Sequence, residues 1–138
     1  MLTVEKVSLL KRVSIFEALP DDLLGGVAAR LQEQQVAAGT PIIVEGQSGT
    51  TMYVIAGGEV RVHSGQALIA RLGPKDVFGE LSALDPEPRS ASVTAETDVS
   101  LLLLEHDELF ELMNERVEVA LGIIRFLCRR YRPRAAEA

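Results

Sequence analysis

Hydrophobic positions follow a helical period at both ends of the chain and a strand-like period in the middle. Residues 1–13 carry apolar side chains at the spacing of an amphipathic helix, which we interpret as a connector from an upstream domain. A second helical segment follows the acidic pair Asp21 and Asp22 and runs to about Leu31. The helical period returns over residues 106–132, in a short segment and then a longer one. We therefore expect helices on both sides of a different kind of structure.

The middle of the chain, residues 34–104, predicts short β-strands. Its β-branched and aliphatic residues gather in short runs that glycine-containing turns separate. These runs occupy residues 41–44, 51–56, 60–63, 68–72, 92–95 and 99–104. Many short strands at this spacing are typical of a sandwich or a jelly roll. The predicted fold class is mainly β with flanking α-helices, in a single domain that spans residues 1–138.

Composition agrees with a globular domain that lies outside the membrane. The apolar content of 47% and the charged content of 25% are ordinary for such a domain, and the absence of Trp implies an aliphatic core. No apolar run approaches the ~20 residues of a membrane-spanning helix, and the N-terminus lacks the apolar core of a signal peptide. We expect a cytoplasmic location and no membrane contact by this chain alone.

Charge and cysteine content exclude several classes of function. The lone Cys128 excludes an internal disulfide and any all-cysteine metal or iron–sulfur site. The net charge of −6 argues against a dedicated nucleic-acid binder. One basic cluster stands near the C-terminus, at Arg125, Arg129, Arg130, Arg132 and Arg134. We interpret it as a cluster that offsets a helix dipole, and we expect no nucleic-acid binding by this chain alone.

Residues 78–93 combine groups that suit a ligand with a phosphate and a sugar. The segment begins Phe78-Gly79-Glu80-Leu81-Ser82 and continues, after a proline-rich loop, with Arg89-Ser90-Ala91. An arginine binds phosphate oxygens in a planar, bidentate way, and backbone N–H groups at the start of a short helix add to an anion site. A carboxylate does not favourably face a phosphate, so Glu80 must accept hydrogen bonds from neutral groups such as sugar hydroxyls. A phosphate and a sugar on one compact ligand indicate a nucleotide.

This segment resembles the phosphate-binding cassette of cyclic nucleotide-binding domains, such as those of catabolite activators and protein kinase A regulatory subunits. The family pattern is matched in register from Phe78 to Leu81, at Leu84 and from Pro88 to Val93. A second family motif lies upstream and comprises Ile42-Ile43, Glu45-Gly46-Gln47, Gly49, Met52-Tyr53-Val54-Ile55 and Gly58. The resemblance covers residues 14–131 and implies an eight-stranded β-roll.

The resemblance also implies roles for the cassette residues. Arg89 would bind the cyclic phosphate and Glu80 the ribose 2′-hydroxyl. The remaining ligand-binding residues would be Gly79, Leu81, Ser82, Ser90 and Ala91, through backbone N–H groups, a hydroxyl and small size. Apart from this ligand, which we expect to be cyclic AMP rather than cyclic GMP, no cofactor is implied. Ser90 favours cyclic AMP because cyclic GMP binders of the family tend to carry threonine there.

The base would lie against the strands and under the last helix. Val62 and Ala70 are the candidate wall of this base pocket, with core packing as an equally good explanation. The candidates for a lid are Phe126, Arg129, Arg130 and Tyr131, of which we expect Phe126 to lie in the core. Two positions depart from the family pattern. Ala83 stands where a larger apolar residue usually couples the cassette to the following helices, and Pro86 stands where glycine is common.

The resulting prediction is a non-catalytic cyclic nucleotide sensor that signals through its C-terminal helices to an attached or partner effector of unknown identity. A metal-dependent enzyme on a similar β-roll would need clustered ligands, whereas His63 and His106 stand alone. The alternative is a docking or dimerisation module that no longer binds nucleotide. A homodimer through the C-terminal helix stays open. A catabolite-activator type of transcription factor would need a winged helix-turn-helix after residue 138, which this chain does not include.

Overall fold

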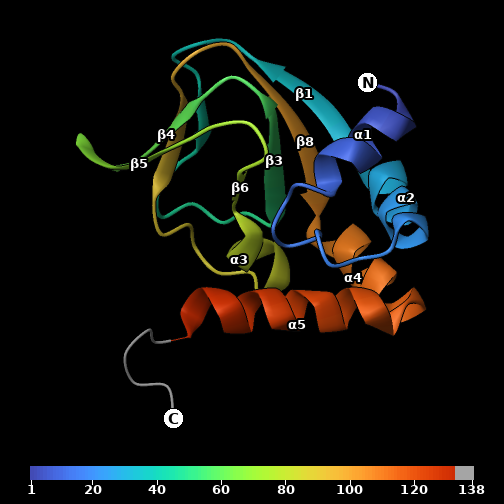
Figure 1. Ribbon diagram of the computed structural model, residues 1–138. Coiled ribbons are helices and arrows are strands. Elements are labelled where there is room, and N and C mark those ends of the chain that lie inside the picture. The colour runs from blue at the N-terminus through green and yellow to red at the C-terminus, as the bar shows by residue number, and fades with distance from the viewer. Residues whose placement is uncertain (133–138) are drawn as a thin grey trace.

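The computed structural model describes residues 1–132, which form five helices and eight strands (Figure 1). In chain order these are α1 (Thr3–Leu10), α2 (Asp21–Arg30), β1 (Gln32–Val36), β2 (Pro41–Ile43), β3 (Thr51–Gly57), β4 (Val60–Ser64), β5 (Ala67–Leu72), β6 (Val77–Phe78), α3 (Glu80–Leu84), β7 (Ser92–Ala95), β8 (Val99–Glu105), α4 (His106–Glu115) and α5 (Val117–Tyr131). The prediction of a mainly β fold with flanking helices is confirmed.

The strands form two antiparallel sheets of four strands each. One sheet has the order β1-β8-β3-β6 and the other the order β2-β7-β4-β5. Strands far apart in the sequence are neighbours, because β1 pairs with β8 and β2 with β7. The cassette helix α3 follows directly after β6, so the β-roll holds the cassette at its edge, above α5 (Figure 1).

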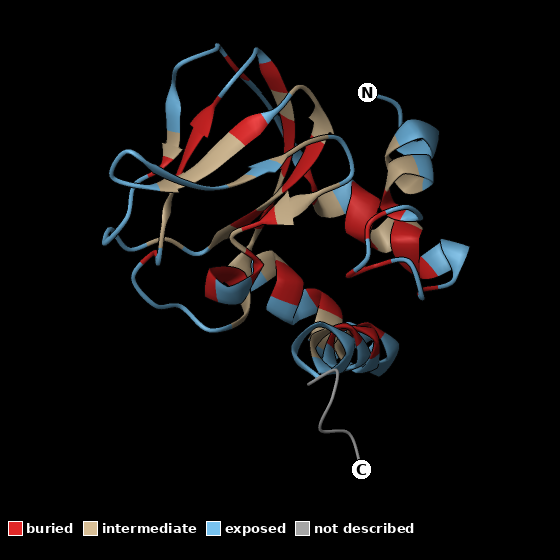
Figure 2. Ribbon diagram, turned by 60° about the vertical axis from the view of Figure 1, so that its left-hand side comes forward, coloured by how far each residue is buried: buried red, intermediate tan, exposed pale blue. Residues whose placement is uncertain are grey.

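Two hydrophobic clusters hold these layers together. Met52 and Val54 of β3 pack with the helices, while Ile55 of the same strand faces the space between the two sheets. β8 alternates in the same way, with Leu102 on the helical side and Leu101 between the sheets. Both strands are buried on two faces, which explains why they read as nearly continuous apolar runs. Figure 2 shows buried residues where strands and helices meet, and exposed hairpin ends.

The helices at both ends of the chain contribute residues to the hydrophobic cluster that contains Met52 and Val54. Leu10 and Val13 are fully buried, and α5 packs on the segment before α2 closely enough that a Cβ on Gly122 would lie 3.0 Å from Leu19 Cδ2. α1 is shorter than the predicted helix and ends at Leu10, where turns begin. The segment that we interpreted as a connector is therefore also part of the core.

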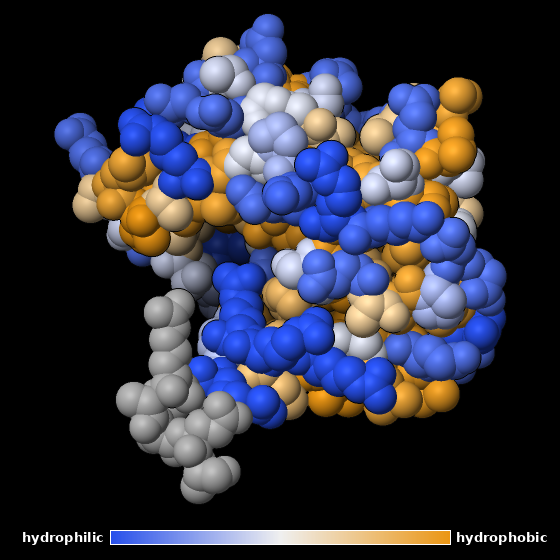
Figure 3. Space-filling view, viewed as in Figure 1, coloured by the Kyte–Doolittle hydropathy of each residue, from blue (hydrophilic) through white to orange (hydrophobic). Residues whose placement is uncertain are grey.

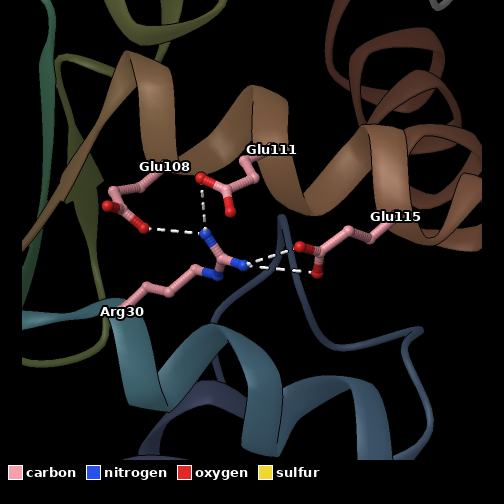
Figure 4. A network of polar contacts seen from close by, with 4 residues as sticks. All are labelled: Arg30, Glu108, Glu111 and Glu115. Carbon is pink, nitrogen blue, oxygen red and sulfur yellow. Dashed lines mark hydrogen bonds and ion pairs between the residues drawn. The ribbon is translucent and has the colours of Figure 1, made fainter.

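An ion network joins α2 to α4. Arg30, the last residue of α2, lies 2.8 Å from Glu108, 3.3 Å from Glu111 and 3.2 Å from Glu115 (Figure 4). The three carboxylates stand on one side of α4 because residues three and four apart in a helix are neighbours. One guanidinium thus fixes the two helices relative to each other.

Two of the strands were not predicted from the sequence. β1 begins at Gln32, before the predicted start of the β-roll at residue 34, and its first four residues are polar and exposed. β6 contains only Val77 and Phe78, too few residues to show a period. Both strands exist because neighbours pair with them: β8 with β1, and β3 with β6. Arg134 of the basic cluster lies outside the described residues.

Candidate functional site

A cavity of about 620 Å³ lies between the cassette, the β4–β5 hairpin and the C-terminal half of α5. Figure 3 shows the hollow, with hydrophobic surface on the hairpin above it and hydrophilic surface on α5 below. Ten of the candidate ligand-binding, base-pocket and lid residues line this cavity: Gly79, Glu80, Leu81, Ser82, Arg89, Ser90, Ala91, Val62, Ala70 and Arg130. The fold therefore brings residues from four separate segments to one place.

Arg89 is buried in the wall of the cavity with only neutral partners. Arg89 is 8% exposed, and its Nη2 donates to the backbone carbonyl of Thr51 at 3.0 Å. Nη1 lies 3.5 Å from the carbonyl of Gly79. No carboxylate in residues 1–132 forms an ion pair with it. Burial lowers the pKa of Arg89, while Tyr53 and Glu105 act in the opposite direction.

Two glycines make room for this guanidinium. A Cβ on Gly49 would lie 2.5 Å from Arg89 Nε, and a Cβ on Gly79 would lie 2.9 Å from Nη1 and 2.8 Å from the Thr51 carbonyl oxygen. Gly79 also has a φ of 76°, a left-handed conformation that favours glycine, and it is the N-cap of α3. The close approach of arginine to backbone therefore requires glycine at both positions.

The upstream motif holds the backbone of the same arginine. Gly46 N–H donates to the Arg89 carbonyl at 2.8 Å, and Arg89 N–H donates to the Gln47 carbonyl at 2.9 Å. Next to them, Ser48 and Pro88 form an isolated bridge. The two motifs that the sequence analysis recognised separately thus form one structure, in which the loop before β3 fixes the position of Arg89.

Glu80 is the acidic residue that the cassette contributes to the cavity wall. It is 5% exposed, and its Oε1 lies 3.0 Å from Nη1 of Arg130 on α5. The first N–H groups of a helix lack intrahelical acceptors, which leaves those of Leu81 and Ser82 available at the start of α3. The cavity therefore offers a cation, a carboxylate and free N–H donors within one short segment.

The opposite wall is apolar. Val62 of β4 pairs with Ala70 of β5 and with Val93 of β7, and all three residues line the cavity. From α5, Phe126 is buried and also lines the cavity, so it belongs to the core, as expected, and to the site. Arg129 and Tyr131 are exposed and are not among the lining residues. A role for Tyr131 as a lid stays a prediction.

A family model described as "Cyclic nucleotide-binding domain" matches residues 33–116, more than half of the chain. The chain belongs to this family. The cyclic nucleotide-binding domain resembles a CRP-like cAMP-activated global transcriptional regulator of Mycobacterium tuberculosis, with 31% identity over 129 residues that cover 90% of this chain and 58% of the regulator. The chain thus spans little more than half the length of that relative.

Solved structures support the same assignment. The N-terminal domain of a transcriptional regulator from Streptomyces coelicolor A3(2) is 37% identical, with a TM-score of 0.83 and coverage of 90% of each chain. The regulatory domain of Toxoplasma gondii PKA, crystallised with cAMP, is 29% identical with a TM-score of 0.75, over 80% of this chain and 44% of that one. These matches confirm the resemblance and the β-roll fold. A cyclic nucleotide-binding domain is typically a non-catalytic module.

Both histidines of the domain form hydrogen bonds with other residues of the fold. His63 bonds to Thr94 Oγ1 and to the Gly65 carbonyl. His106, the first residue of α4, bonds through Nδ1 to the carbonyl of Ala83 in the cassette helix. Ala83, the residue that departs from the family pattern, is fully buried. The hydrogen bond from its backbone carbonyl to His106 still joins this position to the C-terminal helices.

Some residues of the site carried no signal in the sequence. Arg12 and Ser14, in the turns after α1, and Lys75 and Asp76, before β6, line the cavity of the domain. They lie far from the cassette in sequence or outside its motif, and only the folding of the chain brings them to the cavity. The backbone of Lys75 has a positive φ of 71°, and no sequence pattern predicts this conformation.

Two further observations concern metal sites and membrane-spanning helices. Within residues 1–132, no group of three or more His, Cys, Asp or Glu side chains is arranged to hold a metal ion. None of the helices in that part of the chain is long and apolar enough to cross a membrane.

Proposed function

We propose that this domain binds cyclic AMP in the cavity and acts as a regulatory module without catalysis. The observation that carries the proposal is the state of Arg89: a buried guanidinium beside the cavity, held by neutral carbonyl groups. A charge that is removed from water and left without a counter-ion is unfavourable, so an anionic ligand that reaches it gains a strong charge-assisted contact.

The lining residues support one orientation of the nucleotide. The cyclic phosphate would contact Arg89, the hydroxyl of Ser90 and the N–H groups at the start of α3, beside the small Ala91. The ribose would lie at Glu80, whose carboxylate accepts hydrogen bonds from hydroxyl groups. The base would lie on the apolar wall of Val62 and Ala70.

The choice of cyclic AMP over cyclic GMP rests on Ser90 and on the relatives. Ser90 stands where cyclic GMP binders tend to carry threonine, the M. tuberculosis regulator is cAMP-activated, and the T. gondii regulatory domain was crystallised with cAMP. We therefore expect both nucleotides to compete for one site, with cyclic AMP as the stronger ligand.

The helices around the cavity supply a route to an effector. α5 places Phe126 and Arg130 against the ligand site, and α4 contacts the cassette through His106. A ligand that binds better to one arrangement of these helices shifts the population toward it. We propose that an attached or partner effector responds to this shift.

The outer side of α5 supports a homodimer. Its exposed residues Val117, Leu121, Ile124, Cys128 and Tyr131 are spaced alternately by four and three positions, opposite the buried Val119 and Ile123. This spacing is typical of a helix that pairs with a copy of itself. Sedimentation of the wild type and of Ile124→Glu tests the proposal: we expect a dimer that the charge disrupts, and a monomeric wild type would contradict it.

The decisive experiment for ligand binding is isothermal titration with cyclic AMP and cyclic GMP. Loss of two hydrogen bonds to a charged group, about 1.5–3 kcal/mol each, predicts that Arg89→Ala weakens binding roughly 100-fold or more. Arg71→Ala, an exposed arginine of β5 outside the cavity, is the matched control and should bind like the wild type. Absence of binding by a folded, ligand-free wild type would favour the docking or dimerisation module instead.

A further inference from the structure

The lining of the cavity is positively charged in a protein that is negative overall. Four cationic residues and two acidic residues line it: Arg12, Lys75, Arg89 and Arg130, and Asp76 and Glu80. The lining therefore has a formal net charge of +2, whereas the whole chain has one of −6. The residues outside the lining thus carry −8, and their charge repels an anion that approaches from solution.

Two of the four cations lie outside the cassette and have no counter-ion. Arg12 follows α1 and Lys75 precedes β6, and both residues are exposed. Neither forms an ion pair within residues 1–132. The residue next to Arg12 differs in both respects, because Lys11 lies 3.1 Å from Asp21 and does not line the cavity. Unpaired positive charge is therefore present at the cavity, while the adjacent positive charge is paired elsewhere.

The backbone of Lys75 is strained and firmly held. Among residues 1–132 it is the only residue other than glycine with a positive φ, 71°, a conformation that glycine adopts more easily. Its N–H donates to the Ile55 carbonyl at 2.8 Å, and the next residue, Asp76, accepts the Ile55 N–H at 3.0 Å. The Asp76 carboxylate accepts the Gly73 N–H at 2.9 Å, so it is bonded to this turn. Strained residues that their surroundings hold in place are concentrated at functional sites.

Lys75 is near enough to act on an anion that enters the cavity. The four residues of chain from Lys75 to Gly79 span at most about 14 Å, and charges act over about 10 Å in 0.1 M salt. Apolar walls with a low dielectric constant, such as those of Val62 and Leu72, concentrate the field inside a cavity. Cyclic AMP has one anionic group, which the proposed function gives to Arg89. The charge of Lys75 can therefore attract the ligand without binding its phosphate in the complex.

We propose that Arg12 and Lys75 are a capture pair: their unpaired charges draw the anionic nucleotide into the cavity and raise its association rate, while other residues hold it once bound. This inference rests on the proposed function and adds to it how a protein of net charge −6 captures an anion. The strained lysine has a use in this assignment, because glycine would suit the turn but would remove the charge.

The test is the association rate of fluorescently labelled cyclic AMP, measured by stopped-flow mixing with the whole chain. At 0.1 M salt we expect the double variant Arg12→Gln/Lys75→Gln to lower the association rate constant about threefold, and Arg12→Glu/Lys75→Glu about tenfold. At 1 M salt, where charges act over about 3 Å, both differences should fall below about 1.5-fold. The dissociation rate constant should stay within about 1.5-fold of wild type, because charges at a rim act mainly on association.

The matched control is Lys11→Gln/Arg71→Gln, which removes the same charge from two exposed residues outside the cavity. It should keep the association rate constant within about 1.5-fold of wild type at 0.1 M salt. Equal slowing in the control would mean that only the net charge matters and would overturn the inference. Lys75→Gly should capture the ligand more slowly but unfold at a temperature about 2–5 °C higher. A lower unfolding temperature would show that the lysine supports the turn and would overturn its assignment to capture.

The remaining results separate the inference from the proposed function. Faster dissociation with unchanged association would make the capture pair contact residues of the bound ligand and would overturn the inference. Association that is equally fast in wild type and in both double variants would overturn it as well, while ligand binding itself stands. Failure of the folded wild type to bind cyclic AMP in isothermal titration would refute the proposed function, and this inference with it. If a variant at Lys75 does not fold, Arg12→Glu alone should slow association about twofold.

Discussion

Arg89 and Arg30 are both held by several oxygen atoms, but these oxygens carry different charges. Arg30 meets the carboxylates of Glu108, Glu111 and Glu115, whereas Arg89 meets only backbone carbonyls. The hydrogen bond that Arg30 donates to Glu108 raises the pKa of Arg30, and burial lowers the pKa of Arg89. The charge of Arg30 is therefore opposed by three carboxylates, while no carboxylate in residues 1–132 pairs with the positive charge of Arg89, which a ligand can use.

The difference separates a structural region from a binding region. Arg30 joins α2 to α4 (Figure 4), and it does not line the cavity. Arg89 stands in the cavity wall and has glycines around it, so that no side chain competes with a ligand. The charge of an arginine's partners, rather than its burial, therefore indicates whether the arginine is available to an anion.

Among the variants that separate the two arginines, we expect the largest effect from Arg89→Lys. Lysine keeps the positive charge but has no planar fork that reaches the Thr51 carbonyl and a phosphate together. Cyclic AMP affinity should fall by roughly 30- to 100-fold, measured by isothermal titration. Arg30→Lys is the matched control, and its affinity should stay within about threefold of wild type. Equal losses in both variants would mean that the two arginines do not differ in function.

The next effect comes from Gly49→Ala. Its Cβ would approach the Arg89 guanidinium to 2.5 Å, and the flexible arginine, rather than the backbone, would move away. We expect about a tenfold loss of affinity without removal of any charge. Gly25→Ala is the control, because nothing lies within 4 Å of a Cβ in this helical position. Alanine there should stabilise the domain by about 0.5–1 kcal/mol and leave binding unchanged. Wild-type affinity in Gly49→Ala would show that the guanidinium needs no such space.

Arg30→Gln should affect stability instead of binding. It removes the cation that three carboxylates share and leaves them close together on α4. Because those carboxylates are partly exposed, we expect the free energy of unfolding to fall by only about 1–2 kcal/mol, and by less at high salt. Urea unfolding measures this change, with Arg125→Gln as an exposed control on α5. A loss of cyclic AMP affinity above about threefold would contradict the separation of the two regions.

The smallest effect concerns the surface pair of Arg116 and Glu118, 3.1 Å apart. The hydrogen bond from Arg116 lowers the pKa of Glu118 in the folded protein. The stabilising contribution is therefore fully present above the unfolded pKa of the carboxyl, and it is lost as the pH falls through the lowered folded value. We expect Arg116→Gln to change stability little at neutral pH and to flatten its acid dependence, as urea unfolding from pH 7 to pH 3 would show. Identical acid profiles would contradict this.

Much of the fold followed from local sequence. Runs such as 51–56 and 99–104 became strands because their side chains are buried on both faces, which a sequence shows as continuous hydrophobicity. β1 could not be predicted in this way, since residues 32–35 are polar and exposed and only the pairing with β8 makes them a strand. The helical segments were recognised by their period, but the end of α1 at Leu10 depends on the turns that fold Val13 into the core.

The sequence by itself determined the family and the chemical groups of the candidate site, because residues 78–93 carry them in one continuous motif. Only the tertiary structure decided which partners these groups have. The Thr51 carbonyl at Arg89, Arg130 at Glu80 and the carboxylates at Arg30 all come from distant segments. Such contacts depend on how strands pair and helices pack, and no local pattern records that arrangement.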